Sequence, residues 1–215
     1  MPYCHADRNK RLEKFLRCCL NPYLAWTLRP QFFYALALLD KYTMTKRSSP
    51  LDRLARDLTV GTLTWIGLRT ERRGEMLLAE RARAIVNQGL EGDHRMSKTP
   101  GSARQVTLIS EEFIQQITHF TGIASIDPAL LRRNLVVRGI NLNALRHQRF
   151  QIGEAIFEAT ALCHPCSRME TALGKGTVAA MIGHGGLCAR VLSTGYISLG
   201  DRLAVRQDGQ NLDLF

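Results

Sequence analysis

Two segments of the sequence repeat one turn pattern, and this repeat constrains the fold more than any other feature. Residues 151–156 (QIGEAI) and 198–203 (SLGDRL) each place an apolar residue, a glycine, an acid and a further apolar residue in the same order. Glycine permits a tight or left-handed bend, and the acid can accept hydrogen bonds from the free amides of the turn. We therefore expect two matching turns between strands of a β-barrel.

Short strand-like runs separated by turn residues favour the same fold. Residues 77–86 alternate well enough to pair with the run at 60–68 across the turn at 72–74, and residues 89–93 read as a loop. Further strands are expected at residues 105–109, 135–137, 155–160 and 187–192. Helices are few: Ser110 can cap one over residues 111–120, and Asp127 followed by Pro128 can begin a short one toward Arg133. The chain is thus predicted to be mainly β, a β-barrel with a few short helices.

The first 50 residues differ from the rest in charge. Of the 215 residues, residues 1–50 hold nine Lys or Arg against three Asp or Glu, whereas residues 51–215 hold twenty against sixteen. We expect a basic, helical N-terminal extension over residues 1–50, with an amphipathic helix at 8–20, and one domain over residues 51–215. Translation starting at Met44 would make the extension non-native. The mildly basic domain argues against specific nucleic-acid binding, which needs a basic stripe within the fold.

Composition also narrows the compartment and the ligand. No stretch has the uninterrupted apolar length of a membrane-spanning helix, and no secretory signal is recognised. Six cysteines in a chain of this length, without an export signal, indicate reduced thiols and a cytoplasmic protein. Arginine outnumbers lysine by 23 to 6, which favours a small anionic ligand because arginine is the better bidentate partner for phosphate and carboxylate.

The most informative segment for chemistry is residues 163–170 (CHPCSRME), which follows the expected strand at 155–160. It places two thiols, Cys163 and Cys166, at a strand end. A thiolate there would be stabilised by Arg168, by protonated His164, or by a helix that begins near Ser167. A reactive or metal-binding cysteine is the favoured interpretation.

Three other interpretations of these cysteines remain open. Both thiols could be small apolar core residues. They could perform thioredoxin-like exchange, although that chemistry uses a βαβ setting early in the fold. They could also belong to a zinc-stabilised, non-catalytic binding module, whose ligands would be Cys163, Cys166, His184 and Cys188.

Several polar residues near strand ends are candidates for ligand binding. Arg133 and Asn134 precede the strand at 135–137 and offer a planar fork plus an amide, which suits an oxyanion or the edge of a pterin. Arg104 precedes the strand at 105–109. His184 is flanked by glycines and is a candidate acid, base or ligand.

Taken in order along the chain, these pieces resemble the MOSC domain family over about residues 58–206. The resemblance is carried by the opening strand, the loop GLEGDH at 89–94, RQVTLI at 104–109, RNLVV at 133–137, and above all the region from GEA at 153–155 through CHPCSRME to Gly200-Asp201. It is similar to small bacterial stand-alone members. The resemblance implies a β-barrel in which Cys166 ligates molybdenum or carries persulfide sulfur.

The resemblance also implies cofactor, substrate and partners. Arg133 and Asn134 match the family's cofactor-side Arg-x-Asn or Arg-Asn segment and would contact the molybdenum cofactor (molybdopterin). The resemblance assigns the same role less directly to Arg104 and Cys163. Family members include reductases of small N-hydroxylated substrates and proteins known only as sulfur carriers. No pyridoxal-phosphate site is recognised in the sequence. Electrons or sulfur would therefore come from a partner, either a redox donor protein or a cysteine desulfurase.

Overall fold

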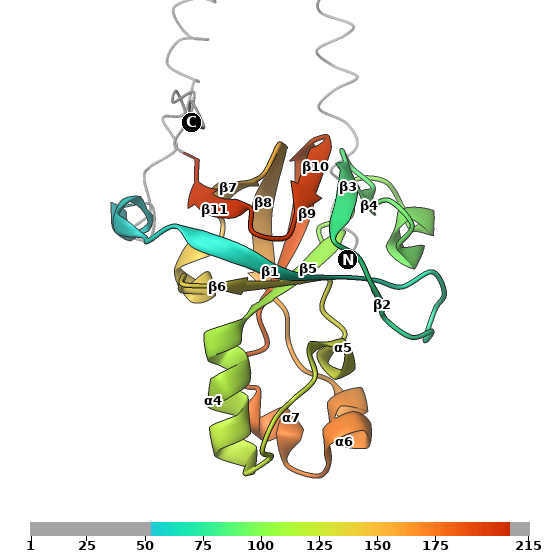
Figure 1. Cartoon of the computed structure of the whole chain (residues 1–215), viewed down its shortest axis with the longest axis vertical. Coiled ribbons are helices and arrows are strands. Elements are labelled where there is room, and N and C mark those ends of the chain that lie inside the picture. The colour runs from blue at the N-terminus through green and yellow to red at the C-terminus, as the bar shows by residue number, and fades with distance from the viewer. Residues whose placement is uncertain (1–52, 207–215) are drawn as a thin grey trace, which may run out of the picture. The chain divides into compact units, whose positions relative to one another are not determined.

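The computed structural model describes residues 53–206, and seven strands of this range close into a mixed β-barrel (Figure 1). Around the barrel the order is β11-β7-β8-β9-β5-β6-β1, and pairing of β1 with β11 closes the ring. Neighbouring strands are antiparallel except β5 and β6, which are parallel. The strands are β1 (Gly61–Leu68), β5 (Val106–Ser110), β6 (Leu135–Arg138), β7 (Arg149–Ile152), β8 (Ala155–Leu162), β9 (Leu187–Ser193) and β11 (Arg202–Val205).

Apolar side chains that alternate along these strands fill the barrel. In β8 every second residue from Ala155 to Ala159 is buried, as period-two alternation requires when one face of a strand packs on a core. Phe150 of β7 and Phe157 of β8 stack within the core with ring centroids 5.5 Å apart. The sequence prediction of a β-barrel is confirmed.

A second sheet corrects part of the expected strand pairing. Residues 77–86 do not form one partner for β1: β2 (Leu77–Leu78) pairs with β1, while β3 (Arg81–Ile85) joins β10 (Gly195–Ser198) and β4 (Gly89–Leu90) in a separate three-stranded sheet. Both residues of β2 are exposed, so the alternation that would extend this hairpin fails there. The expected loop at 89–93 accordingly begins with a short strand.

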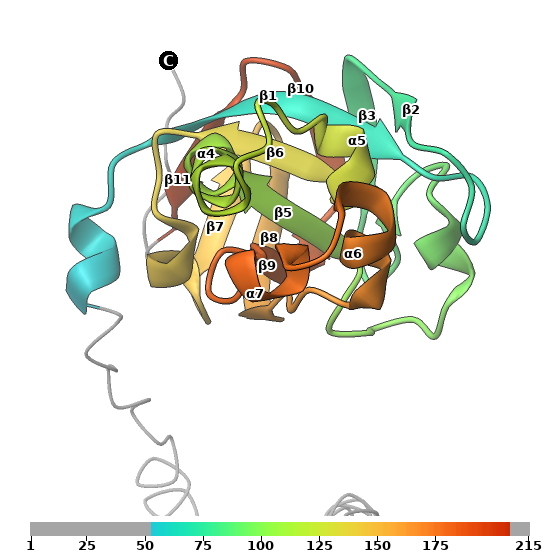
Figure 2. The same ribbon diagram turned by 90° about the horizontal axis from the view of Figure 1, so that it is seen from below.

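The α-helices gather on one side of the barrel (Figures 1 and 2). Ser110 Oγ accepts a hydrogen bond from Phe113 N and caps α4, and Asp127 caps α5 through Ala129 N, as predicted. A second apolar cluster, separate from the barrel interior, packs the helices on the outer face of the sheet. The α-helices are α4 (Glu111–Thr121), α5 (Pro128–Leu131), α6 (Ser167–Leu173) and α7 (Thr177–Ala180), and short 3-10 helices span Ala55–Asp57, His94–Ser97 and Leu142–Leu145.

The two repeated turns are present and contact each other. Gly153 and Gly200 both have positive φ, 51° and 89°. Asp201 Oδ2 accepts a hydrogen bond from Ser198 N at 2.7 Å within its own turn. Glu154 instead accepts one from Tyr196 N at 3.0 Å, across to the strand that leads into the other turn. One turn joins β7 to β8 of the barrel, whereas the other joins β10 of the small sheet to β11.

Some sequence expectations fall outside the described residues. The N-terminal extension over residues 1–50, its helix at 8–20 and a start at Met44 all lie there, as do Cys4, Cys18 and Cys19. Within residues 53–206, every helix is too short or too polar to cross a membrane.

The glycine-rich segment before β9 provides a test of the packing around the barrel. Gly186 has φ +88°, and a Cβ there would overlap the carbonyl oxygen of Leu108 in β5. We expect Gly186→Ala to lower the free energy of unfolding by about 3 kcal/mol, since overpacking adds to the strain of a left-handed alanine. Gly183→Ala, with φ +80° but no atom within 4 Å of its Cβ, should cost only about 1 kcal/mol. Urea unfolding measures both, and equal losses would contradict this packing.

Candidate functional site

Cys166 lies where the barrel meets the helices. Strand β8 ends at Leu162, the chain runs through residues 163–165, and Cys166 is the N-cap of α6. Its side chain is exposed, and its Sγ makes no capping hydrogen bond to the helix. The sulfur is therefore open to an external partner, as the sequence prediction of a functional thiol requires.

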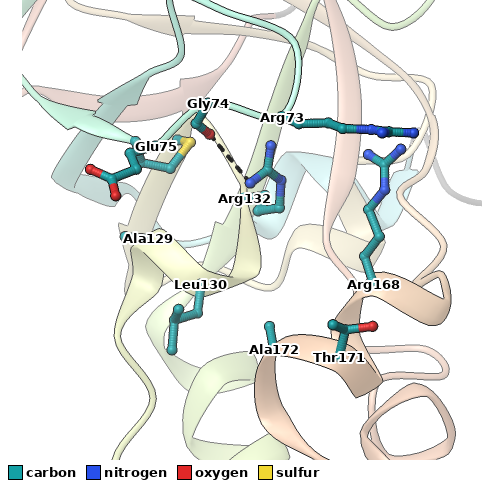
Figure 3. A pocket seen from close by; sticks show the side chains of 10 residues that line it. Arg73, Gly74, Glu75, Ala129, Leu130, Arg132, Arg168, Thr171 and Ala172 are labelled. Atoms are coloured by element: carbon teal, nitrogen blue, oxygen red, sulfur yellow. Dashed lines mark hydrogen bonds between the residues drawn. The ribbon is translucent and has the colours of Figure 1, made fainter.

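A cleft of about 480 Å³ opens beside this helix (Figure 3). Three elements form its walls: α6, α5 with the residue that follows it, and the loop between β1 and β2. Arg168, two residues after Cys166, lines it. The complete lining is Arg73, Gly74, Glu75, Met76, Ala129, Leu130, Arg132, Arg168, Thr171 and Ala172.

Three arginines give this cleft its charge. Arg73, Arg132 and Arg168 line it from three different elements, against one carboxylate, Glu75. Arg132 Nη1 donates to the carbonyl oxygen of Gly74 at 3.4 Å, but its buried Nη2 has no hydrogen-bond partner. Like charges repel, and a buried donor without an acceptor costs free energy. The cleft is therefore suited to an anion that accepts hydrogen bonds from several guanidinium groups.

Arg133, next in the chain, points elsewhere. Its buried guanidinium donates through Nε to Gly185 O at 2.8 Å, through Nη1 to Leu131 O at 2.8 Å, and through Nη2 to Cys163 O at 3.4 Å. Burial lowers the pKa of this group. Arg133 thus ties the loop before Cys166 to the segment before β9, and a contact between Arg133 and a cofactor stays a prediction.

Asn134 is a buried junction between strands. Its Oδ1 accepts hydrogen bonds from the amide and hydroxyl of Thr107 at 3.2 and 2.9 Å, and its Nδ2 donates to Gly67 O at 3.2 Å and to Asp93 Oδ2 at 2.8 Å. All four positions of the side-chain amide are engaged. Asn134 therefore holds β1, β5 and the segment at Asp93 together, and its contact with a cofactor also stays a prediction.

Cys163 occupies a different environment from Cys166. It is 1% exposed, pairs with Cys188 of β9, and accepts a hydrogen bond from Arg104 Nη2 at 3.1 Å. The hydrogen bond with Cys188, followed by the positive charges of Arg133, Arg104 and Arg95, lowers the pKa of Cys163 despite its burial. The same hydrogen bond, together with burial, raises the pKa of Cys188. These opposite shifts favour the thiolate on Cys163 and the thiol on Cys188.

The zinc alternative is not supported by this geometry. Within residues 53–206, no group of three or more His, Cys, Asp or Glu side chains could hold a metal ion. The ring of His184 packs edge-on against Phe113 and Phe120 of α4, with centroids 5.3 and 5.8 Å apart, and its Nδ1 lies 3.1 Å from Ile182 O. The expected zinc ligands Cys163, Cys166, His184 and Cys188 do not converge.

Sequence reasoning found part of this site and missed part. Cys166 and Arg168 were identified, and the structure places Arg104 against Cys163. Arg73 and Arg132 were missed as cleft residues. The Arg-x-Asn spacing of residues 132–134 was the signal that could have identified Arg132, whereas Arg73 lies in a turn whose position the local sequence does not determine.

Comparisons with known proteins agree with this architecture. The model of the family described as MOSC domain matches residues 93–204, just over half of the chain. The solved structure of the YuaD protein from Bacillus subtilis is similar with a TM-score of 0.63 at 18% identity, and the match covers 69% of this chain and 97% of that one. YiiM from Geobacillus stearothermophilus matches with a TM-score of 0.56 at 15% identity, covering 69% and 76%.

These structural similarities establish the fold alone, because their sequence identities are low. YiiM from Escherichia coli is a further example, with a TM-score of 0.50, 19% identity, and coverage of 72% of this chain and 71% of that one. No curated protein matches the sequence significantly.

The Cys163–Cys188 pair predicts a pH dependence of stability. Because the folded-state pKa of Cys163 is lowered, its contribution is lost as pH falls through that pKa and grows as pH rises toward the ordinary thiol value of about 8.5. Above that value the free energy of unfolding falls as pH rises, because the Cys188 thiol ionises in the unfolded chain while its raised pKa keeps it protonated in the folded chain. The difference in free energy of unfolding between wild type and Cys163→Ser should therefore pass through a maximum. A flat difference across pH would contradict the pairing.

Proposed function

The chain belongs to the MOSC domain family, and on that premise we propose that it binds molybdenum cofactor with Cys166 as the protein ligand to molybdenum. The observation that carries the proposal is an exposed sulfur without a capping bond, two residues from an arginine that lines a cleft. Thiolate is a soft ligand suited to such a metal.

The cleft residues fit the anionic part of this cofactor. A pterin with a phosphate group requires a cavity of several hundred Å³ and cationic donors at one end, and ligand pockets commonly span about 300–1,000 Å³. The cleft has about 480 Å³ of space, and one of its lining residues is Arg132, whose buried Nη2 has no hydrogen-bond partner. Arg73 and Arg168 add two planar guanidinium forks for phosphate oxygens.

Each residue would have a distinct task. Arg132, Arg168 and Arg73 bind the anionic group, and the exposed Cys166 thiolate binds the metal. Arg133 and Asn134 act mainly by positioning other groups. The hydrogen bonds of Arg133 hold the loop before Cys166, and those of Asn134 hold the strands next to Arg132. When bound, the cofactor would supply the redox chemistry for two-electron reduction of an N–O bond.

Two forms of the activity use the same thiol. In one, the protein reduces a small N-hydroxylated compound with electrons from a redox donor protein. In the other, Cys166 carries cofactor sulfur as a persulfide received from a cysteine desulfurase. The exposed sulfur of Cys166 favours access by a partner in either case. Arg104 donates to the buried Cys163, and the ring of His184 packs against Phe113 and Phe120, so we assign these two residues no direct task in the cleft.

Molybdenum content tests the ligand assignment. Protein purified from a host that makes the cofactor should contain molybdenum, and Cys166→Ala should lose most of it because the thiolate ligand is removed. Ser167→Ala, also exposed, is the matched control and should retain the wild-type content. Elemental analysis measures all three, and equal molybdenum in wild type and Cys166→Ala would overturn ligation by Cys166.

Arginine substitutions test the assignment of the cleft. Arg132→Ala should weaken retention of the cofactor about tenfold, since a charge-assisted hydrogen bond contributes roughly 1.5–3 kcal/mol. Arg146→Ala, an exposed arginine outside the cleft lining, should leave retention unchanged. Pterin released on denaturation and quantified by fluorescence gives the occupancy of each variant. Similar losses in both variants would indicate a general electrostatic effect and contradict the assigned cleft.

A further inference from the structure

A pair of buried thiols lies behind Cys166 and takes no part in the proposed cofactor site. Cys188 lies on β9, opposite Ala161 of β8, and Cys163 follows directly after the end of β8. Cys163 N donates to Gly186 O at 2.7 Å, so the pairing of β8 with β9 continues for one more residue on each side. Each thiol lies close enough to the other to shift its pKa, and the two residues are 1% and 4% exposed.

The surroundings of this pair make Cys163 the nucleophile and Cys188 the second thiol that reacts with it. Arg104 Nη2 donates to Cys163 Sγ at 3.1 Å, so Cys163 is the sulfur that holds the negative charge. A thiolate is the reactive form of cysteine, and arginine nearby stabilises it. The raised pKa of Cys188 favours its protonated form beside Cys163. A protonated thiol beside a reactive thiolate is the arrangement from which an intramolecular disulfide forms.

A small cavity lies beside Cys163. The cavity has a volume of about 10 Å³ and includes Cys163, His164, Pro165 and Met181 in its wall. A space of this size holds about one water molecule. A bulky disulfide such as oxidised glutathione cannot enter a space of this size, so a small oxidant is the reagent considered for the buried pair.

We propose that Cys163 and Cys188 form a peroxide-sensitive dithiol, separate in chemistry from Cys166. The Cys163 thiolate attacks one oxygen of hydrogen peroxide, which breaks the O–O bond, gives Cys163 sulfenic acid and releases hydroxide. The Cys188 thiol then attacks the sulfenic sulfur, a disulfide forms, and water leaves. The two thiols are oxidised by two electrons in total. The Cys188 proton leaves in the water of the second step, and the hydroxide of the first step takes up a proton from solvent, so the peroxide is reduced to two water molecules.

Oxidation would change the surroundings of Cys166 without touching its sulfur. The disulfide removes the negative charge that Arg104 contacts, and the same charge also faces Arg133. Arg133 donates to the backbone of Cys163. Loss of the negative charge therefore alters the electrostatic surroundings of a residue that holds the loop leading to Cys166. The dithiol therefore couples exposure to peroxide with the position of Cys166.

Peptide mapping of the full chain tests this proposal. Trypsin leaves Cys163 and Cys166 together in residues 150–168, whereas Cys188 lies in residues 176–190, so Cys166→Ser makes the assignment unambiguous. Reduced protein is treated with hydrogen peroxide, quenched with catalase, alkylated in denaturant and analysed by mass spectrometry. We expect a disulfide between residues 150–168 and 176–190 in both wild type and Cys166→Ser.

Two variants separate a specific reaction from general oxidation. Cys188→Ser should abolish the linked peptides and leave Cys163 as a sulfenic acid that dimedone traps. Arg104→Ala should need about tenfold more peroxide for the same yield, because a charge-assisted hydrogen bond to the thiolate is lost. Circular dichroism confirms folding of each variant, and Cys188→Ala replaces Cys188→Ser if the serine variant does not fold. Absence of the linked peptides in folded Cys166→Ser would overturn the proposal, and so would an Arg104→Ala yield equal to wild type.

Discussion

The buried amide of Asn134 is the interaction on which the arrangement of the site depends. Its hydrogen bonds join Thr107, Gly67 and Asp93, which belong to three separate segments. Asp93 in turn accepts hydrogen bonds from the amides of Arg69 and Arg95, so its position is determined by the same network. Because Asn134 follows Arg132 and Arg133 directly, this network also fixes where those two arginines leave the barrel. One buried amide thus sets the orientation of two cations, Arg132 in the lining of the cleft and Arg133 bonded to loop carbonyl groups.

The charge around this junction is poorly balanced within the described part of the chain. Arg69, Arg95, Arg104 and Arg132 interact repulsively, and Asp93 is the carboxylate that offsets part of this repulsion. Burial lowers the pKa of Arg69 to about 10. Such repulsion destabilises the fold unless an anion is present. The Cys163 thiolate offsets some of the excess on one side, and an anion in the cleft would offset the excess near Arg132.

The sequence predicted what local rules determine and missed what depends on distant packing. Strand alternation, the Ser110 and Asp127 caps and the paired glycine turns follow from neighbouring residues, and the structure has them. The extended hairpin at 77–86 was wrong because pairing of β3 with β10 joins segments over a hundred residues apart. Arg73 and Arg132 meet only because the β1–β2 loop folds against α5. The side chain of Arg133 is likewise oriented by carbonyl groups of loops that are distant in the sequence, so the residues next to Arg133 do not predict where it points.

Cys163 and Cys166 are separated by two residues, yet the fold gives them opposite surroundings. The end of β8 keeps Cys163 in register with β9 and buried against Cys188. Pro165 then carries the chain away from the ladder, so Cys166 emerges at the start of α6 with an exposed sulfur. A sulfur that must bind an external partner needs the second environment, whereas a buried thiol pair needs the first. The change from strand to helix across residues 163–166 is therefore what allows one short segment to present one buried and one exposed thiol.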